Sequence, residues 1–140
     1  QIPREIVQQA VDARQQAYPV LREWLEKIRE QAASGALLDN GFGRLMRPDP
    51  QRAKTQGPAL MGQGAARDIV CESLLRLVDR DARVRDHLRG SVHDEVILSV
   101  PEAEAGYWTE VLEDAFTWTW RDVPILCEVG KPSLRWSDCK

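Results

Sequence analysis

The chain has 140 residues, of which 43% are hydrophobic and 29% charged, and its net charge is −3. This composition is typical of a globular protein with one core, and no segment is low-complexity enough to indicate disorder. The sequence has no run of about 18 apolar residues, so we expect neither a membrane-spanning helix nor a membrane partner.

The first 35 residues predict a helical segment. From Pro3 to about Ala33, apolar residues recur at steps of three and four, the spacing of a helix with one buried face. Tyr18-Pro19 should kink or split this helix, because proline disfavours helical geometry in the residue before it. A β-hairpin is expected next, since Leu37-Leu38 and Phe42 to Met46 flank the turn signal Asp39-Asn40-Gly41.

A long helix is expected from near Gln51 to about Asp86, with Gly57-Pro58 and Gly62 as points of disturbance. Its predicted buried stripe consists of apolar residues at helical spacing, namely Ile69, Val70, Leu74, Leu77 and Val78. The flank near its start is built from small residues, namely Gly62, Gly64, Ala65 and Ala66. Such a flank lets a neighbouring helix or a nucleic-acid strand approach closely.

A second hairpin is predicted around His93-Asp94-Glu95, because Ser91-Val92 precedes this acidic tip and Val96 to Val100 follows it. A helix should then run from Pro101 through Phe116, and a last strand should span Ile125 to Val129. The order of elements predicts an α+β fold, with an antiparallel sheet and packed helices.

Charge is unevenly distributed along the chain. Arg44, Arg47, Arg52 and Lys54 form a locally basic stretch, whereas Pro101 to Trp120 carries five acidic residues and no basic one. Two ordinary solvated faces would explain this pattern, and so would a phosphate-binding face beside an acidic one.

The tripeptide His93-Asp94-Glu95 is the sharpest local feature. A tight turn between two strands fixes its side chains well, so adjacent carboxylates there could hold a divalent cation. Mg²⁺ is the natural candidate, because it binds one or two carboxylates together with substrate phosphates. The alternative is that Asp94 serves only the turn itself, as aspartates in hairpin turns usually do.

Six short segments occur in a characteristic order: Tyr18-Pro19, Gly43-Arg44, Gln63 to Ile69, Ser91 to Val96, Val123 to Ile125 and Glu128 to Gly130. Residues 91–96 resemble the V-H-D-E motif of family A DNA polymerases, the family of bacterial DNA polymerase I. The other five resemble successive elements of the same palm subdomain, and some phage replication polymerases look closer still. The resemblance runs from about Tyr18 to Trp136 and implies the C-terminal part of a polymerase palm. Residues 1–35 would be a helical segment leading into the palm, and residues 36–140 the C-terminal palm, together one partial domain.

The resemblance implies a role for each matching position. Asp94 would be a catalytic metal-binding aspartate, Glu95 an auxiliary carboxylate near the metals, and His93 a neighbour of the primer terminus. Gln63 matches a glutamine that reaches the minor groove of primer-template DNA, and Arg44 lies in a hairpin that contacts the duplex. By charge and location, the other expected phosphate contacts are Arg47, Arg52 and Lys54. Two positions depart from the family pattern: Ala59 replaces an asparagine and Thr55 an arginine.

The implied chemistry is two-metal nucleotidyl transfer from a dNTP to primer-template DNA, with Mg²⁺ as the cofactor. The family's second catalytic aspartate, in a motif of the D-Y-S-x-I-E type, does not occur here, and neither does the R-x3-K-x6-Y-G pattern of its nucleotide-binding helix. We therefore expect a fragment or subunit of a DNA polymerase that is inactive alone and needs the missing portion as a partner.

Two other interpretations remain open: a non-catalytic, palm-derived module that binds DNA or protein, and a plain structural domain. Apolar surface made for the missing portion could also cause self-association. The tryptophans of the C-terminal half are expected to serve packing rather than base stacking. The three cysteines are odd in number and widely spaced, which is typical of reduced thiols in a cytoplasmic protein of a bacterium or a phage-infected cell.

Overall fold

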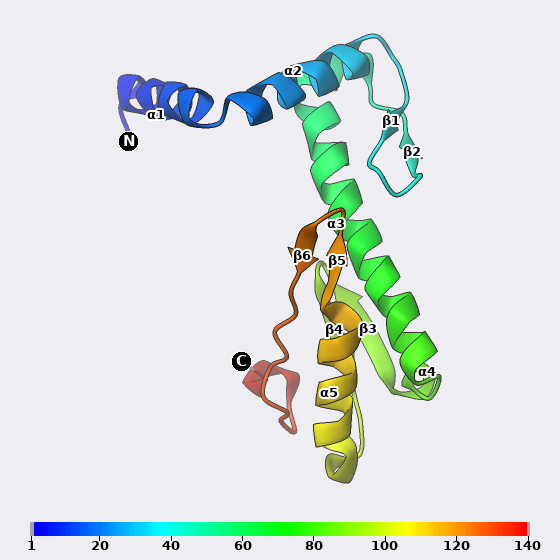
Figure 1. The fold of residues 1–140 in the computed structure, drawn as a ribbon. Helices are drawn as coiled ribbons and strands as arrows, with labels where there is room; N and C mark the ends of the chain where they lie inside the picture. The colour runs from blue at the N-terminus through cyan, green and yellow to red at the C-terminus, as the bar shows by residue number, and fades with distance from the viewer. Residues whose placement is uncertain (1, 140) are drawn as a thin grey trace. The chain divides into compact units, whose positions relative to one another are not determined.

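The computed structural model describes residues 2–139, and its first elements are two helices, α1 (Arg4–Ala17) and α2 (Pro19–Ala33) (Figure 1). Tyr18 between them leaves helical geometry, with φ −128° and ψ 68°, because it precedes a proline. Pro19 then starts α2, where its missing N–H group costs nothing. The predicted split of the N-terminal helix is confirmed.

The first hairpin consists of the strands β1 (Leu38–Asp39) and β2 (Leu45–Met46), which pair antiparallel. Its turn is held by side chains, since the Asp39 carboxylate accepts the N–H of Gly41 at 2.8 Å. The Asn40 side chain accepts the N–H of Phe42 at 3.1 Å. The predicted hairpin is confirmed, although its paired strands are shorter than expected because most of the segment serves the turn.

The long helix α3 (Ala53–Arg80) follows a 3₁₀ turn at Pro50–Arg52 and continues through Gly57-Pro58 and Gly62 without a break. Its predicted end near Asp86 is wrong: α3 stops at Arg80, and a separate short helix, α4 (Val84–His87), follows. The Asp81 carboxylate accepts the N–H of Arg83 at 2.9 Å between the two helices, and this local bond stabilises the break.

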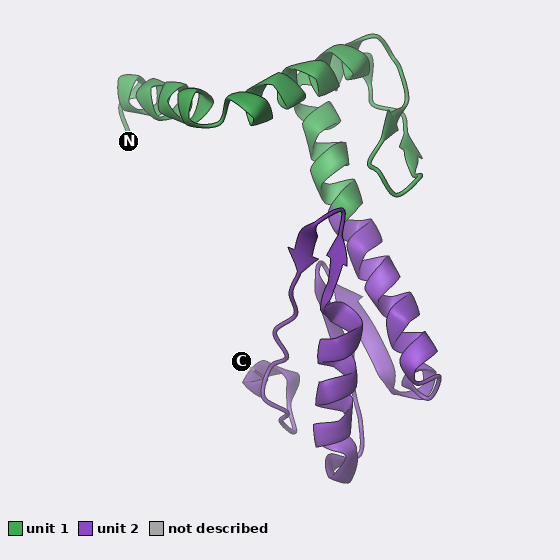
Figure 2. Ribbon diagram, viewed as in Figure 1, with its two compact units in different colours: residues 1–65 green, residues 66–140 purple. Residues whose placement is uncertain are grey.

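Contacts divide the chain into two units, residues 1–65 and 66–140 (Figure 2). The core of the first unit is small and consists of Ile28, Ala32, Leu38 and Ala53. Glycines let α3 approach its neighbours there: a Cβ at Gly57 would lie 3.0 Å from the Ala32 Cβ, and one at Gly64 would lie 2.9 Å from the Met46 sulfur. These glycines therefore serve packing against α2 and the first hairpin.

The second unit contains two further hairpins and a helix. β3 (Leu88–Val92) pairs with β4 (Glu95–Leu98), and β5 (Trp118–Trp120) pairs with β6 (Val123–Ile125). Between the two pairs lies the helix α5 (Ala105–Phe116), which was predicted to start at Pro101 and begins after a 3₁₀ turn at Glu102–Glu104. The antiparallel pairing is confirmed, but within residues 2–139 it forms three separate two-stranded sheets and not one. The last strand is also displaced from the predicted Ile125 to Val129, since it ends at Ile125 and pairs with a strand that the sequence did not suggest.

The core of the second unit consists of Leu77, Val84, Trp108 and Ala115. From the predicted stripe of α3, Val70 and Leu77 are buried and the others are half-buried. Trp118 is held against α3, because its indole N–H donates to the Ser73 hydroxyl at 2.9 Å.

No helix within residues 2–139 has the length and hydrophobicity that crossing a bilayer requires.

Arg83 ties the end of α3 to α5. Its guanidinium donates to Oδ2 of Asp81 at 2.8 and 3.0 Å, to Oδ1 of Asp81 at 3.3 Å, and to the carboxylate of Glu104 at 3.2 Å. Tyr107 donates its hydroxyl to Asp81 at 2.8 Å. These bonds, chiefly those from Arg83, lower the pKa of Asp81 from 3.8 to about 2.

This network predicts acid sensitivity. A carboxylate with a lowered pKa in the folded state stabilises the fold above its unfolded pKa of about 3.9. We expect the Asp81 contribution to be complete above that pH and to be lost progressively as the pH falls toward 2. Urea unfolding at pH 6, 4 and 2.5 measures the effect, with Asp81→Asn as the reference. The network is disproved if Asp81→Asn and the parent chain lose stability equally over this range.

Candidate functional site

The acidic tip is the two-residue turn of the β3–β4 hairpin. Val92 pairs with Glu95, so His93 and Asp94 alone form the turn, and Glu95 is the first residue of β4. All three side chains of the predicted site, those of His93, Asp94 and Glu95, are exposed. The structure thus brings them together at one end of a hairpin, with Asp94 at its tip.

The backbone of this turn is strained at His93, whose φ is 56°. This left-handed conformation costs a residue with a Cβ about 1 to 2 kcal/mol relative to an ordinary conformation. Glycine or asparagine usually occupies such a position. Strained backbone persists where the surrounding structure enforces it, and it is concentrated at functional sites.

The carboxylate of Asp94 does not stabilise its own turn. Within the described part of the chain it accepts no hydrogen bond, whereas the Asp39 carboxylate of the first hairpin accepts the N–H of Gly41. A hydrogen bond to its own turn therefore does not account for an aspartate at position 94. Its oxygens are open to solvent and to a ligand.

The donor set at the tip suits part of a magnesium site. Carboxylate oxygens are the ligands that Mg²⁺ prefers, and it can bind through one or two of them while keeping its waters. Over residues 2–139, no three His, Cys, Asp or Glu side chains gather closely enough to hold a metal ion. Asp94 and Glu95 can thus supply some ligands of such a site, and the remaining ones have to come from elsewhere.

The predicted DNA-contacting residues lie in the first unit. Arg44 and Arg47 flank the strand β2, while Arg52 and Lys54 lie at the start of α3, and all four are exposed. Gln63 is also exposed, farther along α3. A Cβ on its neighbour Gly62 would meet no atom within 4 Å, so the surface at this position is open.

Arg29 is a basic residue of this region that the sequence did not single out. Its side-chain Nε donates to the main-chain oxygen of Lys54 at 3.3 Å, which brings α2 beside the start of α3. The two residues are 25 positions apart, so no local pattern could have paired them. The basic stretch predicted from the sequence gains one more cation through folding.

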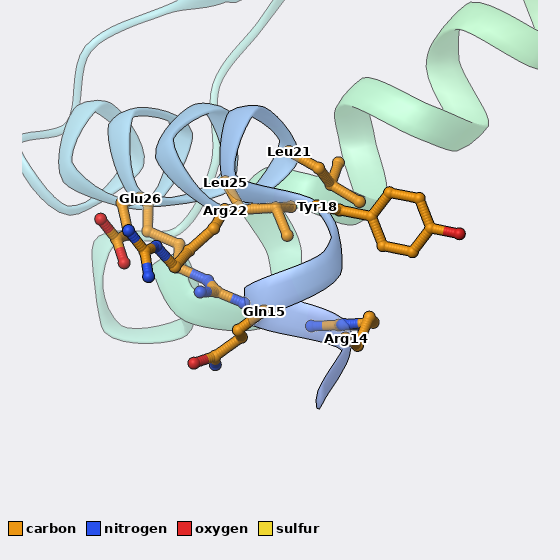
Figure 3. Close-up of a pocket in the computed structure, with 8 residues that line it drawn as sticks. Arg14, Gln15, Tyr18, Leu21, Arg22, Leu25 and Glu26 are labelled. Atoms are coloured by element: carbon orange, nitrogen blue, oxygen red, sulfur yellow. The ribbon is translucent and has the colours of Figure 1, made fainter. Parts of the chain in front are cut away.

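A small pocket lies at the junction of α1 and α2 (Figure 3), with a volume of about 30 Å³. This volume accommodates about one water molecule, not a nucleotide. Its lining includes Arg14, Tyr18 and Arg22, and none of the predicted site residues. The candidate residues therefore form two separate exposed features, a basic surface in the first unit and a hairpin tip in the second.

The chain is similar in sequence to known DNA polymerases. It is 30% identical to the thermostable DNA polymerase I of Thermus filiformis over 82% of this chain. It is 31% identical to the DNA polymerase of Mycobacterium phage D29 over 74%, and 30% identical to the thermostable DNA polymerase I of Thermus aquaticus over 92%. The sequence identities to the phage polymerase and to the two bacterial polymerases are nearly equal, so they do not assign the chain to either group.

The chain spans only 15% to 17% of the length of these three relatives. A comparison with protein-family models gave no match, and neither did a comparison with solved structures. The relationship therefore rests on sequence similarity along most of this chain and concerns one segment of a much longer protein.

Proposed function

The chain is a homologue of family A DNA polymerases over most of its length, and from this we propose that it is the C-terminal palm portion of such an enzyme. In this role, Asp94 contributes a metal-binding carboxylate to nucleotidyl transfer during DNA replication. The enzyme would act in the cytoplasm of a bacterium or a phage-infected cell.

One observation carries the proposal. The Asp94 carboxylate is exposed at the end of a two-stranded hairpin, accepts no hydrogen bond within residues 2–139, and follows a residue with a strained backbone. A metal ligand has to keep its oxygens available and its position fixed. The same hairpin carries the residues that resemble the V-H-D-E motif.

The reaction joins the primer 3′-oxygen to the α-phosphorus of a dNTP, and the bond from that phosphorus to pyrophosphate breaks. Asp94 and Glu95 would help to hold Mg²⁺, which would supply positive charge to stabilise the charge that develops in this reaction. Asp94 would hold this charge beside the primer terminus, with Glu95 as an auxiliary carboxylate and His93 next to the terminal nucleotide. Gln63 would read the minor groove of the duplex.

The basic residues of the first unit would hold the DNA backbone. Arg44, Arg47, Arg52 and Lys54 are exposed, and Arg29 lies beside Lys54. Cations at such positions neutralise phosphates without reading sequence, which suits an enzyme that copies any template. The missing portion of the polymerase would bind the incoming dNTP and would supply the second catalytic carboxylate.

The direct test is Mg²⁺-dependent primer extension by this chain, alone and mixed with the polypeptide encoded immediately upstream of it. We expect extension only in the mixture, because the chain lacks the second carboxylate and the nucleotide-binding helix. Single-turnover extension of a labelled primer measures it. Absence of extension in the mixture, with both polypeptides folded, would contradict the proposal.

A second candidate function is a non-catalytic module that binds duplex DNA, and the exposed basic residues of the first unit favour it. Both functions predict salt-sensitive binding, because each phosphate contact adds about 0.9 to the slope of log affinity against log salt. Arg47→Ala should reduce that slope by about one, with the exposed Arg4→Ala as a matched control. Fluorescence anisotropy of labelled duplex DNA at salt concentrations from about 50 to 200 mM measures this slope. An unchanged slope would remove Arg47 from the DNA contact.

The two functions differ in their response to the hairpin tip. Binding by a non-catalytic module is indifferent to Mg²⁺ and to the charge of Asp94. If the parent chain and Asp94→Asn bind duplex DNA equally, with and without Mg²⁺, and the mixture does not extend primers, the non-catalytic module is favoured over the polymerase portion.

A further inference from the structure

The base of the β3–β4 hairpin carries a two-sided hydrogen-bond clamp. The N–H of Ser99 donates to the main-chain oxygen of His87 at 2.9 Å. In return, the imidazole Nδ1 of His87 lies 3.1 Å from the main-chain oxygen of Ser99. A carbonyl oxygen can only accept, so Nδ1 must carry the hydrogen of this bond. The neutral Nδ1–H tautomer and the imidazolium both satisfy it.

The imidazole of His87 also contacts the core. It meets the Trp108 ring edge-on, with ring centroids 4.9 Å apart and an interplanar angle of 68°. Trp108 is 1% exposed, and its indole N–H donates to the Glu104 carboxylate at 3.1 Å. Arg83 bonds the same carboxylate and lies over the Trp108 ring, 5.4 Å from its centroid. His87 thus links the hairpin to a buried and hydrogen-bonded residue.

The hairpin's own pairing is limited, and besides His87 it is attached to the core through Leu98 and Val100. It has only two strands, and the register shifts between Leu88 and Gly90, near the base. An isolated two-stranded hairpin is at best marginally stable in water, and a bulge bends the strand that contains it. The base of β3–β4 is thus the place where its direction can change.

A change of direction at the base is magnified at the tip. Ser99 lies five positions after Asp94, which corresponds to roughly 17 Å at about 3.4 Å per residue. A tilt of only about 3° at the clamp would then move the Asp94 carboxylate by about 1 Å. A misplacement of this size can cost an enzyme on the order of 100-fold in rate.

We propose that His87 is a positioning residue, which fixes the Asp94 carboxylate by clamping the hairpin base to Ser99 and Trp108. This inference rests on the proposed function of Asp94. His87 touches neither substrate nor metal, and it acts only through the direction of the hairpin. Neither His87 nor Ser99 belongs to the six short segments on which the resemblance to the polymerase palm is based.

The test compares three variants in primer extension by the reconstituted polymerase. His87→Ala removes the clamp and should lower the single-turnover rate at least 10-fold and raise the Mg²⁺ concentration for half-maximal rate, with DNA affinity unchanged within about 2-fold. His87→Asn keeps an N–H donor near the Nδ1 position and should restore most of the rate. Ser99→Ala keeps both main-chain groups of the clamp and should match the parent chain.

The outcomes separate the clamp from a general loss of stability. If His87→Ala lowers the melting temperature but leaves the rate and the Mg²⁺ dependence unchanged, His87 is merely structural and the proposal fails. Amide hydrogen exchange of the 140-residue chain gives a readout that needs no activity. The amides of residues 92–95 should exchange at least 10-fold faster in His87→Ala than in Ser99→Ala.

This second measurement also distinguishes the two proposals. Normal extension by Asp94→Asn would end the catalytic role of Asp94, while faster exchange in His87→Ala would still establish the clamp. Equal exchange in His87→Ala and Ser99→Ala overturns the clamp whatever the polymerase assay gives.

Discussion

Replacing Asp94 by asparagine is expected to abolish primer extension by the reconstituted polymerase while leaving its DNA affinity nearly unchanged. Asparagine has almost the same size as aspartate, and the position is exposed, so the hairpin should fold as before. The amide lacks the negative charge that holds a divalent cation. A bound metal supplies several kcal/mol of transition-state stabilisation, so its loss corresponds to a rate reduction of about 1,000-fold or more.

The chain offers a matched control for this change. Asp122 lies in the two-residue turn of the β5–β6 hairpin and is exposed like Asp94, although its φ is positive, 67°, and that of Asp94 is not. Asp122→Asn should extend primers at the parental rate. Single-turnover extension at saturating DNA and a range of Mg²⁺ concentrations measures both variants. Near-normal extension by Asp94→Asn would remove this carboxylate from the proposed site.

Replacing Trp108 by alanine should cause the largest loss of stability in the second unit, about 3 to 5 kcal/mol. The side chain is 1% exposed and packs among Leu77, Val84 and Ala115. Its removal leaves a cavity, deprives Glu104 of a hydrogen bond and takes away the surface under Arg83 and His87. Urea unfolding followed by circular dichroism gives the free energy of unfolding.

Trp136→Ala is the control, because Trp136 is the same residue type but 58% exposed. Its replacement should change the free energy of unfolding by less than about 0.5 kcal/mol, as is usual for surface positions. Similar losses for both variants would mean that Trp108 is not the centre of this core. A cooperative transition is needed to compare them, and coincident far-UV and fluorescence curves test that condition.

The elements that were predicted correctly depend on local chemistry. The break at Tyr18-Pro19 follows from proline geometry, and the first hairpin follows from the Asp39-Asn40-Gly41 turn, whose side chains bond their own backbone. The acidic hairpin tip was also predicted from the β-branched run after it. In each case the residues that decide the structure lie within a few positions of one another.

The incorrect predictions concern elements whose structure depends on residues far away in the sequence or on turns without a typical sequence signal. Gly57-Pro58 suggests a disturbed helix, yet α3 passes through it while Gly57 packs closely against Ala32 and Ile28. β5 was missed because Trp118-Thr119-Trp120 is short, and its turn, Arg121-Asp122, adopts positive φ without a glycine. A single sheet was expected, but the described strands form three two-stranded sheets.

The sequence by itself determined which residues could carry chemistry: the carboxylate at a hairpin tip, the basic stretch before α3 and the ordered resemblance to a polymerase palm. Tertiary structure alone decided that Arg29 lies beside Lys54 and that His87 clamps Ser99. These partners are 25 and 12 positions apart, so their contact depends on how helices and strands pack. Local propensity selects the elements, and only burial of the core fixes which distant side chains meet.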